Sequence, residues 1–278
     1  MSSPSQVSLS LCLVGAGNMG GAMLGGWLAA GQTPSAITVI DPNPPQAMAK
    51  LIADSGVNHA TGPQDAERSD LYVVAVKPQI MGAVLPGLAD HIDSENALVS
   101  VAAGTTIAML EAPFAAVQPR IIRAMPNTPA LVQRGITVCV ANQRVSAEQR
   151  QSVSTVMSAI GDVEWVEDEG LIDAVTGVSG SGPAYVFHLA EALTEAGVAA
   201  GLPVELAAKL AEATVSGAGE LMRQSDHSPA QLRRNVTSPN GTTQAALEIL
   251  MDDNGFPALL EKAVAAATQR SRELASGS

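Results

Sequence analysis

Short, continuous apolar runs alternate with amphipathic segments through the first 167 residues of the chain. The segments between the runs, such as residues 45–56 and 146–161, place apolar residues at helical spacing. A strand that is apolar throughout is typical of a sheet buried on both faces. The pattern therefore predicts an α/β domain over residues 1–167, with a parallel sheet between layers of helices. Its expected strands are residues 11–15, 37–40, 71–76, 97–103, 120–125, 136–141 and 163–167.

From residue 168 to residue 278 the pattern changes, because no further strand candidate appears and helical spacing prevails. This half is expected to form an all-helical domain. Two stretches interrupt it with glycine, serine and proline: VSGSGPAY at 178–185 and VTSPNGTT at 236–243. A packed helical domain does not need two such loops for stability, so both are candidates for function. The expected helices are residues 171–178, 184–201, 204–224, 229–236, 242–253 and 257–275.

Composition and charge narrow the function classes. With 46% apolar and 15% charged residues, the chain is expected to fold into a globule with an aliphatic core, since only 3% of its residues are aromatic. The net charge of −12, with no basic run beyond Arg233-Arg234, disfavours a nucleic acid or an anionic membrane surface as partner. No apolar run reaches the ~20 residues that a bilayer span requires.

Targeting and metal signals are also missing from the sequence. The first ten residues, MSSPSQVSLS, have no basic stretch, so we do not expect a secretory signal. Cys12 and Cys139 both fall in apolar strand-like runs, which indicates reduced core residues of a cytoplasmic protein. The four histidines are scattered, and no cysteine or histidine cluster has metal-ligand spacing, so no metal site is expected.

The segment Gly15-Ala16-Gly17-Asn18-Met19-Gly20 carries the most specific chemistry of the first half. It follows a buried strand and opens a helix, as the dinucleotide-binding pattern G-x-G-x-x-G requires. The first glycine permits a tight turn, the second lets the backbone approach a pyrophosphate, and the third allows close helix packing. The alternative is a glycine-rich turn without a ligand.

Asp41 and Asn43 follow the second expected strand. An acidic side chain there accepts from a ribose 2′-hydroxyl and favours NAD(H) over NADP(H), whereas Asn43 could donate to a 2′-phosphate. The alternative is that Asp41 or Asn43 caps a helix with Pro44 or Pro45 in its first turn. Both assignments can hold together, and the choice of cofactor stays open at this stage.

Three further loops follow expected strands, at residues 76–78, 102–104 and 125–129. In an open parallel sheet, ligands bind outside the carboxyl ends of the strands, so these loops are expected to line a cofactor groove. Lys77 is equally compatible with a solvated charge. His188 lies in an apolar helix and is more compatible with packing than with catalysis. These side chains include no evident strong acid or base. They therefore suit a reaction that needs none, such as reduction of a C=N bond.

In the second interruption, Ser238-Pro239-Asn240-Gly241 has turn chemistry, and Thr242-Thr243 begins a helix. The free N–H groups of a helix start can hold a carboxylate, and the Thr243 hydroxyl can bond to a substrate nitrogen. The alternative is a helix–turn–helix in which one of the two threonines is an N-cap.

Taken together, the chain resembles the Δ1-pyrroline-5-carboxylate reductase family from about residue 10 to residue 275. The resemblance implies a Rossmann-type cofactor domain followed by an all-α dimerisation domain, and reduction of (S)-1-pyrroline-5-carboxylate to L-proline. It implies NADPH as cofactor, with NADH possible, and a homodimer that in some members assembles further into a decamer. The motifs that carry it are Val76-Lys77-Pro78-Gln79, residues 125–129, 172–185 and 236–243.

The resemblance also implies roles for particular residues. Thr243 is the expected catalytic residue, and Glu169, Gly241, Thr242 and Thr243 are expected to contact the substrate, in a site shared between two subunits. Cofactor contacts are expected at Val14, Gly15, Ala16, Gly17, Asn18, Met19, Asp41, Asn43, Val76, Lys77, Pro78, Ala103 and Asn235.

Two positions depart from the family's usual pattern. Asn240 stands where the family often has glycine, and asparagine tolerates the left-handed conformation that such a turn needs. Gly62 falls near a position where relatives often carry an asparagine on the adenosine side. Because this asparagine is missing and Asp41 is present, the family's usual preference for NADPH is in doubt.

Two other functions remain open from the sequence alone. The first is a related imine reductase or β-hydroxyacid dehydrogenase. The hydroxyacid enzymes use a catalytic lysine in the helical domain, where Lys209 and Lys262 are the only candidates, and neither lies beside a glycine loop. A non-catalytic nucleotide-binding protein would need no second pocket, and the 236–243 loop therefore argues against it.

Overall fold

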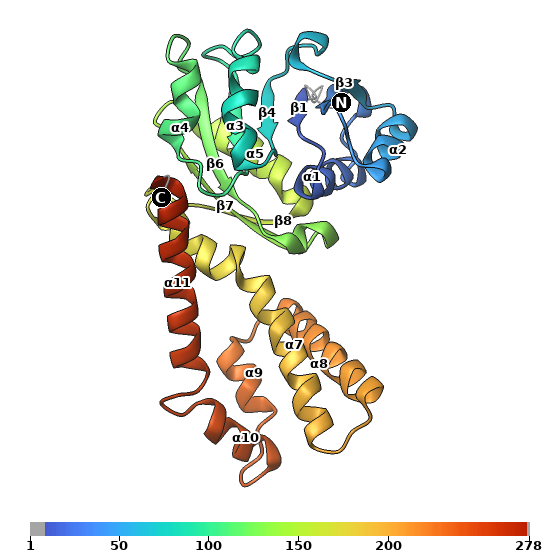
Figure 1. Ribbon diagram of the computed structural model, residues 1–278, viewed down its shortest axis with the longest axis vertical. Helices are drawn as coiled ribbons and strands as arrows, with labels where there is room; N and C mark the ends of the chain where they lie inside the picture. Colours follow the sequence, from blue (N-terminus) through green and yellow to red (C-terminus); the bar gives the residue numbers. More distant parts are fainter. Residues whose placement is uncertain (1–8, 277–278) are drawn as a thin grey trace, which may run out of the picture. The chain divides into compact units, whose positions relative to one another are not determined.

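The structure is a computed structural model that describes residues 9–276 (Figure 1). The chain divides into two compact units: one holds the chain up to Gly180 and the stretch from Thr268 onward, the other holds Ser181–Ala267. The sequence predicted no secretory signal in the first ten residues, and most of these residues lie outside the described range. None of the described helices is both long and apolar enough to cross a membrane.

An eight-stranded sheet with the order β3-β2-β1-β4-β5-β6-β7-β8 forms the centre of the first unit. All seven strands expected from the sequence are present, within a few residues of their expected bounds. The strands are β1 (Leu11–Val14), β2 (Ile37–Ile40), β3 (Asn58–Ala60), β4 (Leu71–Val74), β5 (Ala97–Ser100), β6 (Arg120–Met125), β7 (Gly135–Ala141) and β8 (Gly161–Trp165).

Two features of the sheet differ from the sequence expectation. The β6–β7 pair is antiparallel, whereas a parallel sheet was predicted. The connection between these strands is short and contains only a 3₁₀ turn (Thr128–Val132), too little for the helical crossover that parallel strands need. The sequence also missed β3, because this edge strand has three residues, Asn-His-Ala, of which two are exposed.

Helices cover both faces of the sheet, as the continuous apolar strands predict (Figure 1). On one face pack α1 (Asn18–Ala29), α2 (Gln46–Ser55) and α5 (Ala147–Met157). On the other pack α3 (Pro78–Val84) and α4 (Ile107–Glu111). Trp27 of α1 is buried and its indole N–H donates to the carbonyl of Val156, so α1 and α5 are joined across the first face.

Cys12 and Cys139 are free, fully buried thiols inside these layers. Burial raises the pKa of each thiol to about 12, so both stay protonated well above neutral pH. We expect neither cysteine of the native protein to react with an aromatic disulfide reagent between pH 7 and 9, and both to react after unfolding in guanidinium chloride. Absorbance of the released thiolate counts them; rapid labelling of the native protein would contradict the burial.

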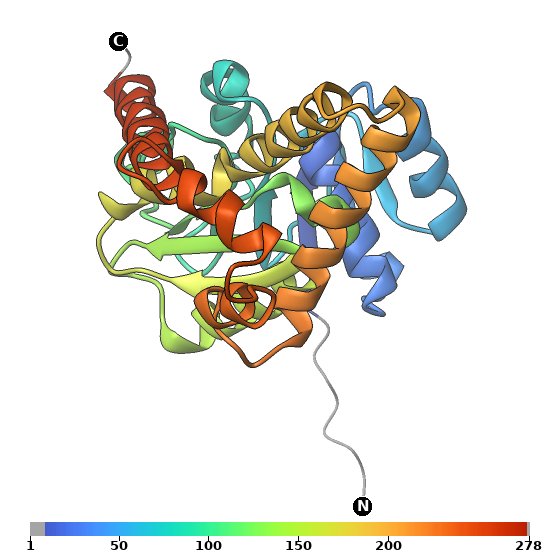
Figure 2. The same ribbon diagram turned by 90° about the horizontal axis from the view of Figure 1, so that it is seen from below.

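The second unit is all helical, with no strand among its residues, as expected. Helices α7 (Gly182–Ala199) and α8 (Val204–Gln224) lie side by side, and the chain continues through α9 (Pro229–Asn235) and α10 (Thr242–Leu250) into α11 (Phe256–Ser276) (Figures 1 and 2). Large apolar side chains stay exposed on these helices, among them Phe187, Leu210, Leu221, Ile249 and Leu259. One copy of this unit does not bury its own apolar surface.

The first glycine-rich interruption is helical, not a loop. After α6 (Leu171–Val175) the chain forms a π-helical segment, Thr176–Gly180, and α7 starts two residues later with Pro183 in its first turn. Gly180 packs against the end of the Met125 side chain, since a Cβ there would lie 2.6 Å from its methyl carbon. A π-helical segment of this kind is frequent at functional sites.

The boundary between the two compact units lies further along the chain than the end of the last strand, β8. The sequence placed a boundary between residues 167 and 168, where the strand pattern stops. Helix α6 nevertheless packs on the sheet, because Ile172 is fully buried against Val138 and Val140. The last turns of α11 also belong to this unit, since the Ser271 hydroxyl donates to the Asp173 carboxylate at 2.7 Å.

Candidate active site

The sheet aligns the carboxyl ends of β1, β2, β4 and β5 along one edge. The register places Val14 beside Ile40 and Val74, and Val74 beside Ser100. The loops that follow these strands therefore lie next to one another, which is where open α/β sheets bind ligands. Twelve expected cofactor contacts lie on this edge: Val14, Gly15, Ala16, Gly17, Asn18, Met19, Asp41, Asn43, Val76, Lys77, Pro78 and Ala103.

The structure itself requires two of the three glycines of the first turn, Gly15 and Gly20. Gly15 has a φ of +95°, a left-handed conformation that side chains rarely adopt. A Cβ on Gly20 would lie 2.0 Å from the carbonyl oxygen of Gly15, so glycine lets α1 start close against the strand. A Cβ on Gly17 would meet nothing within 4 Å. Glycine at position 17 therefore serves no contact within the described protein and leaves space at the N-terminus of α1, as a bound pyrophosphate would need.

Asp41 fixes this turn through both of its carboxylate oxygens. Oδ2 accepts from the backbone N–H of Ala16 at 2.7 Å, and Oδ1 accepts from the N–H of Asn43 at 2.9 Å. The alternative assignment as a helix cap is wrong, because α2 begins at Gln46 with Pro45 at its N-cap. Asp41 thus holds a fixed negative charge beside the glycine turn.

A crevice of about 350 Å³ opens beside Asp41 and is the best candidate for the adenosine half of a dinucleotide. Its walls are mostly apolar, and none of its lining residues is a lysine, an arginine or a histidine. Gly62 lies here, facing the same crevice as Asp41. The lining residues are Val14, Gly15, Ile40, Asp41, Pro42, Thr61, Gly62, Pro63, Val76, Ile80, Ala83, Val84 and Gly87.

Replacement of Asp41 by serine is expected to change the choice between the two nicotinamide cofactors. The variant removes the fixed charge where a 2′-phosphate would lie, so kcat/KM for NADPH should rise relative to NADH by roughly 10- to 100-fold, the scale of a hydrogen bond to a charged group. The ratio of the two kcat/KM values measures the effect. Asp54→Ser on the exposed face of α2 is the control; an unchanged ratio in Asp41→Ser would remove Asp41 from cofactor discrimination.

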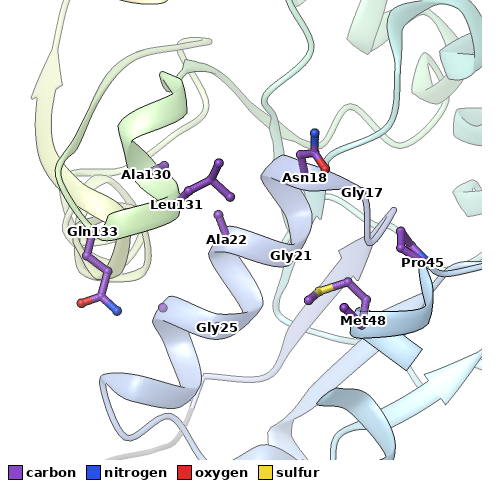
Figure 3. A pocket seen from close by; sticks show the side chains of 12 residues that line it. Gly17, Asn18, Gly21, Ala22, Gly25, Pro45, Met48, Ala130, Leu131 and Gln133 are labelled. Atoms are coloured by element: carbon purple, nitrogen blue, oxygen red, sulfur yellow. The ribbon is translucent and has the colours of Figure 1, made fainter. Parts of the chain in front are cut away.

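A second hollow, of about 410 Å³, follows α1 away from the strand ends (Figure 3). It starts at Gly17 and Asn18 and continues past Gly21 and Gly25, between the start of α2 and the 3₁₀ turn with Leu131. Its lining carries no charged side chain. The hollow therefore adjoins the proposed phosphate position without forming part of the crevice next to Asp41.

The loops after β4 and β5 complete the edge. Lys77 is the N-cap of α3 and is exposed, with Pro78 as the first helical residue. Val76 lies close against the glycine turn, since a Cβ on Gly15 would be 2.8 Å from its methyl carbon. Ala103 is exposed, and Gly104 beside it has a φ of +72°.

Asn127 ties the loop after β6 to the π-helical segment. Its side-chain amide donates to the carbonyl of Ser179 at 3.1 Å, and its side-chain oxygen accepts from the N–H of Ile136 at 2.9 Å. Residues 125–129 are therefore held from both sides, next to the edge that carries the cofactor candidates.

The carboxylate of Glu169 bonds to other groups of the protein. One of its carboxylate oxygens accepts from the guanidinium of Arg123 at 3.0 Å and from the N–H of Ile107 at 2.8 Å. The resemblance implied a substrate contact for this residue, and that role stays a prediction beside the two bonds within the first unit. Arg123, which the sequence showed only as part of a strand, is a buried, ion-paired charge that sequence reasoning missed, as is the crevice around Thr61.

The 236–243 loop belongs to the second unit and has the turn that its sequence predicts. Asn240 has a φ of +57°, so asparagine adopts the left-handed conformation that this turn needs. Gly241 is the N-cap of α10 and leaves the N–H groups of its first turn without helical partners. No hydrogen bond within the described residues engages the hydroxyl of Thr242 or Thr243, so the alternative of a threonine N-cap is wrong. Asn235 is exposed at the end of α9.

Comparisons with known proteins support both halves of this arrangement. A family model described as pyrroline-5-carboxylate reductase dimerisation matches residues 169–274, and one described as NADP oxidoreductase, coenzyme F420-dependent, matches residues 10–104. A pyrroline-5-carboxylate reductase of Pseudomonas aeruginosa is 45% identical over 95% of this chain and 96% of its own. A human pyrroline-5-carboxylate reductase 2 is 39% identical over 96% of this chain and 84% of its own.

Solved structures agree with these relatives. The structure of a pyrroline-5-carboxylate reductase from Coxiella burnetii superimposes with a TM-score of 0.89 at 37% identity, covering 96% of this chain and 98% of the other. A pyrroline carboxylate reductase from Plasmodium falciparum, crystallised with NADP bound, gives a TM-score of 0.80 at 30% identity over 96% and 98% of the two chains.

Proposed function

The chain belongs to the pyrroline-5-carboxylate reductase family, and we infer that it reduces 1-pyrroline-5-carboxylate to L-proline with NAD(P)H. The observation in the structure that carries this function furthest is the open space at Gly17, at the N-terminus of α1 and at the carboxyl edge of the sheet. Together with the crevice beside Asp41, it provides both a phosphate position and a nucleoside position.

When bound, the nicotinamide supplies a hydride to the imine carbon C5 of the substrate ring, and the ring nitrogen becomes an amine. A protonated imine is already electrophilic, so the protein needs no strong acid or base near the reacting carbon. The protein then has two tasks: to hold the cofactor and the substrate in the orientation for hydride transfer, and to exclude water.

On the cofactor side, the proposed contacts fall on the sheet edge described above, and the family resemblance adds Asn235. Gly17 and the N–H groups at the start of α1 hold the pyrophosphate, and Asp41 faces the adenosine ribose. Val76, Lys77, Pro78 and Ala103 line the path towards the nicotinamide. These assignments are supported by the neighbouring positions of the loops and by the open glycine.

On the substrate side, Gly241, Thr242 and Thr243 hold the substrate, the carboxylate being bound by the free N–H groups of the first turn of α10. Thr243 is half-buried and its hydroxyl is free to bond to the ring nitrogen. The hydroxyls of Thr176, Thr194 and Thr237, by contrast, donate to carbonyls four residues earlier. Thr243 is the catalytic residue in this proposal.

The protein forms a homo-oligomer through its dimerisation domain. We propose that the dimer is the active unit, with its site completed by the partner's 236–243 loop, and that dimers assemble further into a decamer. The exposed apolar side chains of α7, α8, α10 and α11 support this arrangement. Light scattering of the active protein tests it, since a stable and active monomer would overturn the shared site. The buried free thiols support a cytoplasmic location.

The first experiment is oxidation of NADH and of NADPH with pyrroline-5-carboxylate as substrate, followed at the nicotinamide absorbance. Turnover with formation of proline supports the function, and the two kcat/KM values give the cofactor preference. A protein that binds the dinucleotide but turns over neither pair would contradict it. Other cyclic imines would then be tested before a purely nucleotide-binding role.

A further inference from the structure

Arg123 carries a permanent charge into the interior of the first unit. It lies on β6 between Ser100 of β5 and Val140 of β7, and it is only 3% exposed. A guanidinium is not deprotonated in proteins, so its burial is costly unless an anion and hydrogen bonds compensate it. The position of the residue that compensates Arg123 is therefore important for the stability of the fold.

Glu169 is the compensating residue. Its Oε1 lies 3.0 Å from Nη1 of Arg123, while Nη2 of the same guanidinium is buried without a hydrogen-bond partner. Within the described residues, Glu169 is the only carboxylate that bonds to Arg123. The same Oε1 accepts from the backbone N–H of Ile107 at 2.8 Å, so one oxygen joins a charge inside the sheet to the first residue of α4.

Ile107 ends the turn that follows β5, and this turn carries Ala103. The start of the turn is fixed by Ser100, whose hydroxyl oxygen accepts from the N–H of Ala102 at 3.3 Å. Its middle is packed by Leu274, because a Cβ on Gly104 would lie 3.3 Å from the Cβ of that leucine. Its far end is held by Glu169, which is therefore one of three anchors of the backbone at residues 103–106.

We propose that Glu169 is a positioning residue for the cofactor, which acts through Ile107 and the Ala103 turn while Arg123 orients its carboxylate. The family resemblance implied a substrate contact for Glu169 instead, and the test below distinguishes the two roles. The proposal rests on the proposed function for its kinetic consequences. Its binding consequences need only a dinucleotide at the sheet edge.

A control residue lies at the other end of α4, the helix whose first residue bonds to Glu169. Glu111 ends α4, and its Oε1 accepts from Arg144 at 2.7 Å and from the side-chain amide of Asn142 at 2.8 Å. The side chains of Glu111 and Glu169 are 35% and 32% exposed, respectively. The two glutamates therefore lie at opposite ends of α4, and each accepts from an arginine and from a second donor at similar exposure. They differ in that Arg144 is exposed and Arg123 is buried, and only Glu169 adjoins the Ala103 turn.

The test compares Glu169→Ala, Glu111→Ala and the double variant Arg123→Leu/Glu169→Ala in the full-length oligomer. Kd for NADH and NADPH is measured by fluorescence titration, thermal stability by Tm, and KM for both substrates by turnover. Glu169→Ala should raise the cofactor Kd about tenfold, the scale of one ordinary hydrogen bond lost from the Ala103 turn, and lower Tm. Glu111→Ala should leave Kd within a factor of about two, because the Ala103 turn keeps its anchor.

The double variant separates positioning from stability. Removing both buried charges should recover much of the Tm lost in Glu169→Ala, because the unpaired guanidinium is gone. The Kd should stay raised, because Ile107 still lacks its acceptor. Glu169→Gln, which keeps an acceptor oxygen, should stay close to the wild-type Kd.

Two outcomes would overturn the proposal. A lowered Tm with unchanged cofactor Kd in Glu169→Ala would leave Glu169 a purely structural role. A raised KM for pyrroline-5-carboxylate with unchanged cofactor Kd would make it a substrate contact after all. Failure of the proposed function is a separate result, namely a wild-type protein without turnover, and the Kd comparison would still decide the role of Glu169.

Discussion

Replacing Gly17 by alanine is expected to weaken dinucleotide binding by roughly 100-fold while the protein keeps its stability. The backbone at Gly17, with φ −71° and ψ −161°, suits any residue, and the added Cβ meets no protein atom within 4 Å. The methyl group would instead occupy the space in which a pyrophosphate approaches the backbone. Fluorescence titration with NADH and NADPH gives the affinity, and calorimetry gives the stability.

Two other glycines of α1 provide the controls for this prediction. Gly25 also has open space at its Cβ position, but it lies two helical turns further on, so Gly25→Ala should leave Kd unchanged and raise stability by up to about 1 kcal/mol. Gly20→Ala should destabilise the fold by at least about 1–3 kcal/mol, since its Cβ would overlap the Gly15 carbonyl. Full dinucleotide affinity in Gly17→Ala would show that the glycine turn is not a phosphate site.

Replacement of Thr243 by valine is expected to lower kcat by roughly 10²- to 10³-fold, equivalent to about 2.7–4 kcal/mol of barrier. Valine keeps the branched shape but removes the hydroxyl that we assign to the ring nitrogen, while the free N–H groups at the start of α10 remain. The loss should therefore appear mainly in kcat and less in KM for pyrroline-5-carboxylate. Steady-state kinetics at saturating cofactor measures both.

Thr243→Ser and Thr194→Val serve as controls for this loss. Serine keeps a hydroxyl at the position and should retain much of the activity. Thr194 lies on α7, and its hydroxyl already donates to the carbonyl of Ala190, so its replacement by valine should leave kcat unchanged. Unchanged kcat and KM in Thr243→Val would remove Thr243 from the mechanism and leave the substrate to backbone groups alone.

The sequence by itself determined the features whose causes are local. The glycine turn at residues 15–20, the buried strands and the helices from α7 onward follow from conformational preference and hydrophobic period, which neighbouring residues set. The 236–243 loop is of the same kind, since proline, asparagine and glycine specify a turn and Asn240 adopts the left-handed conformation that this turn needs. Each of these features was therefore visible in a short stretch of the chain.

Only the tertiary structure decided which distant groups meet. Asp41 reaches back to the N–H of Ala16, and the crevice forms between loops after β1, β2 and β3 that only the sheet register brings together. Arg123 and Glu169 are 46 residues apart and meet because α6 packs on the sheet and stays with the first unit. Such pairs depend on burial and on long-range packing, which create a need for a partner without leaving a local signal in the sequence.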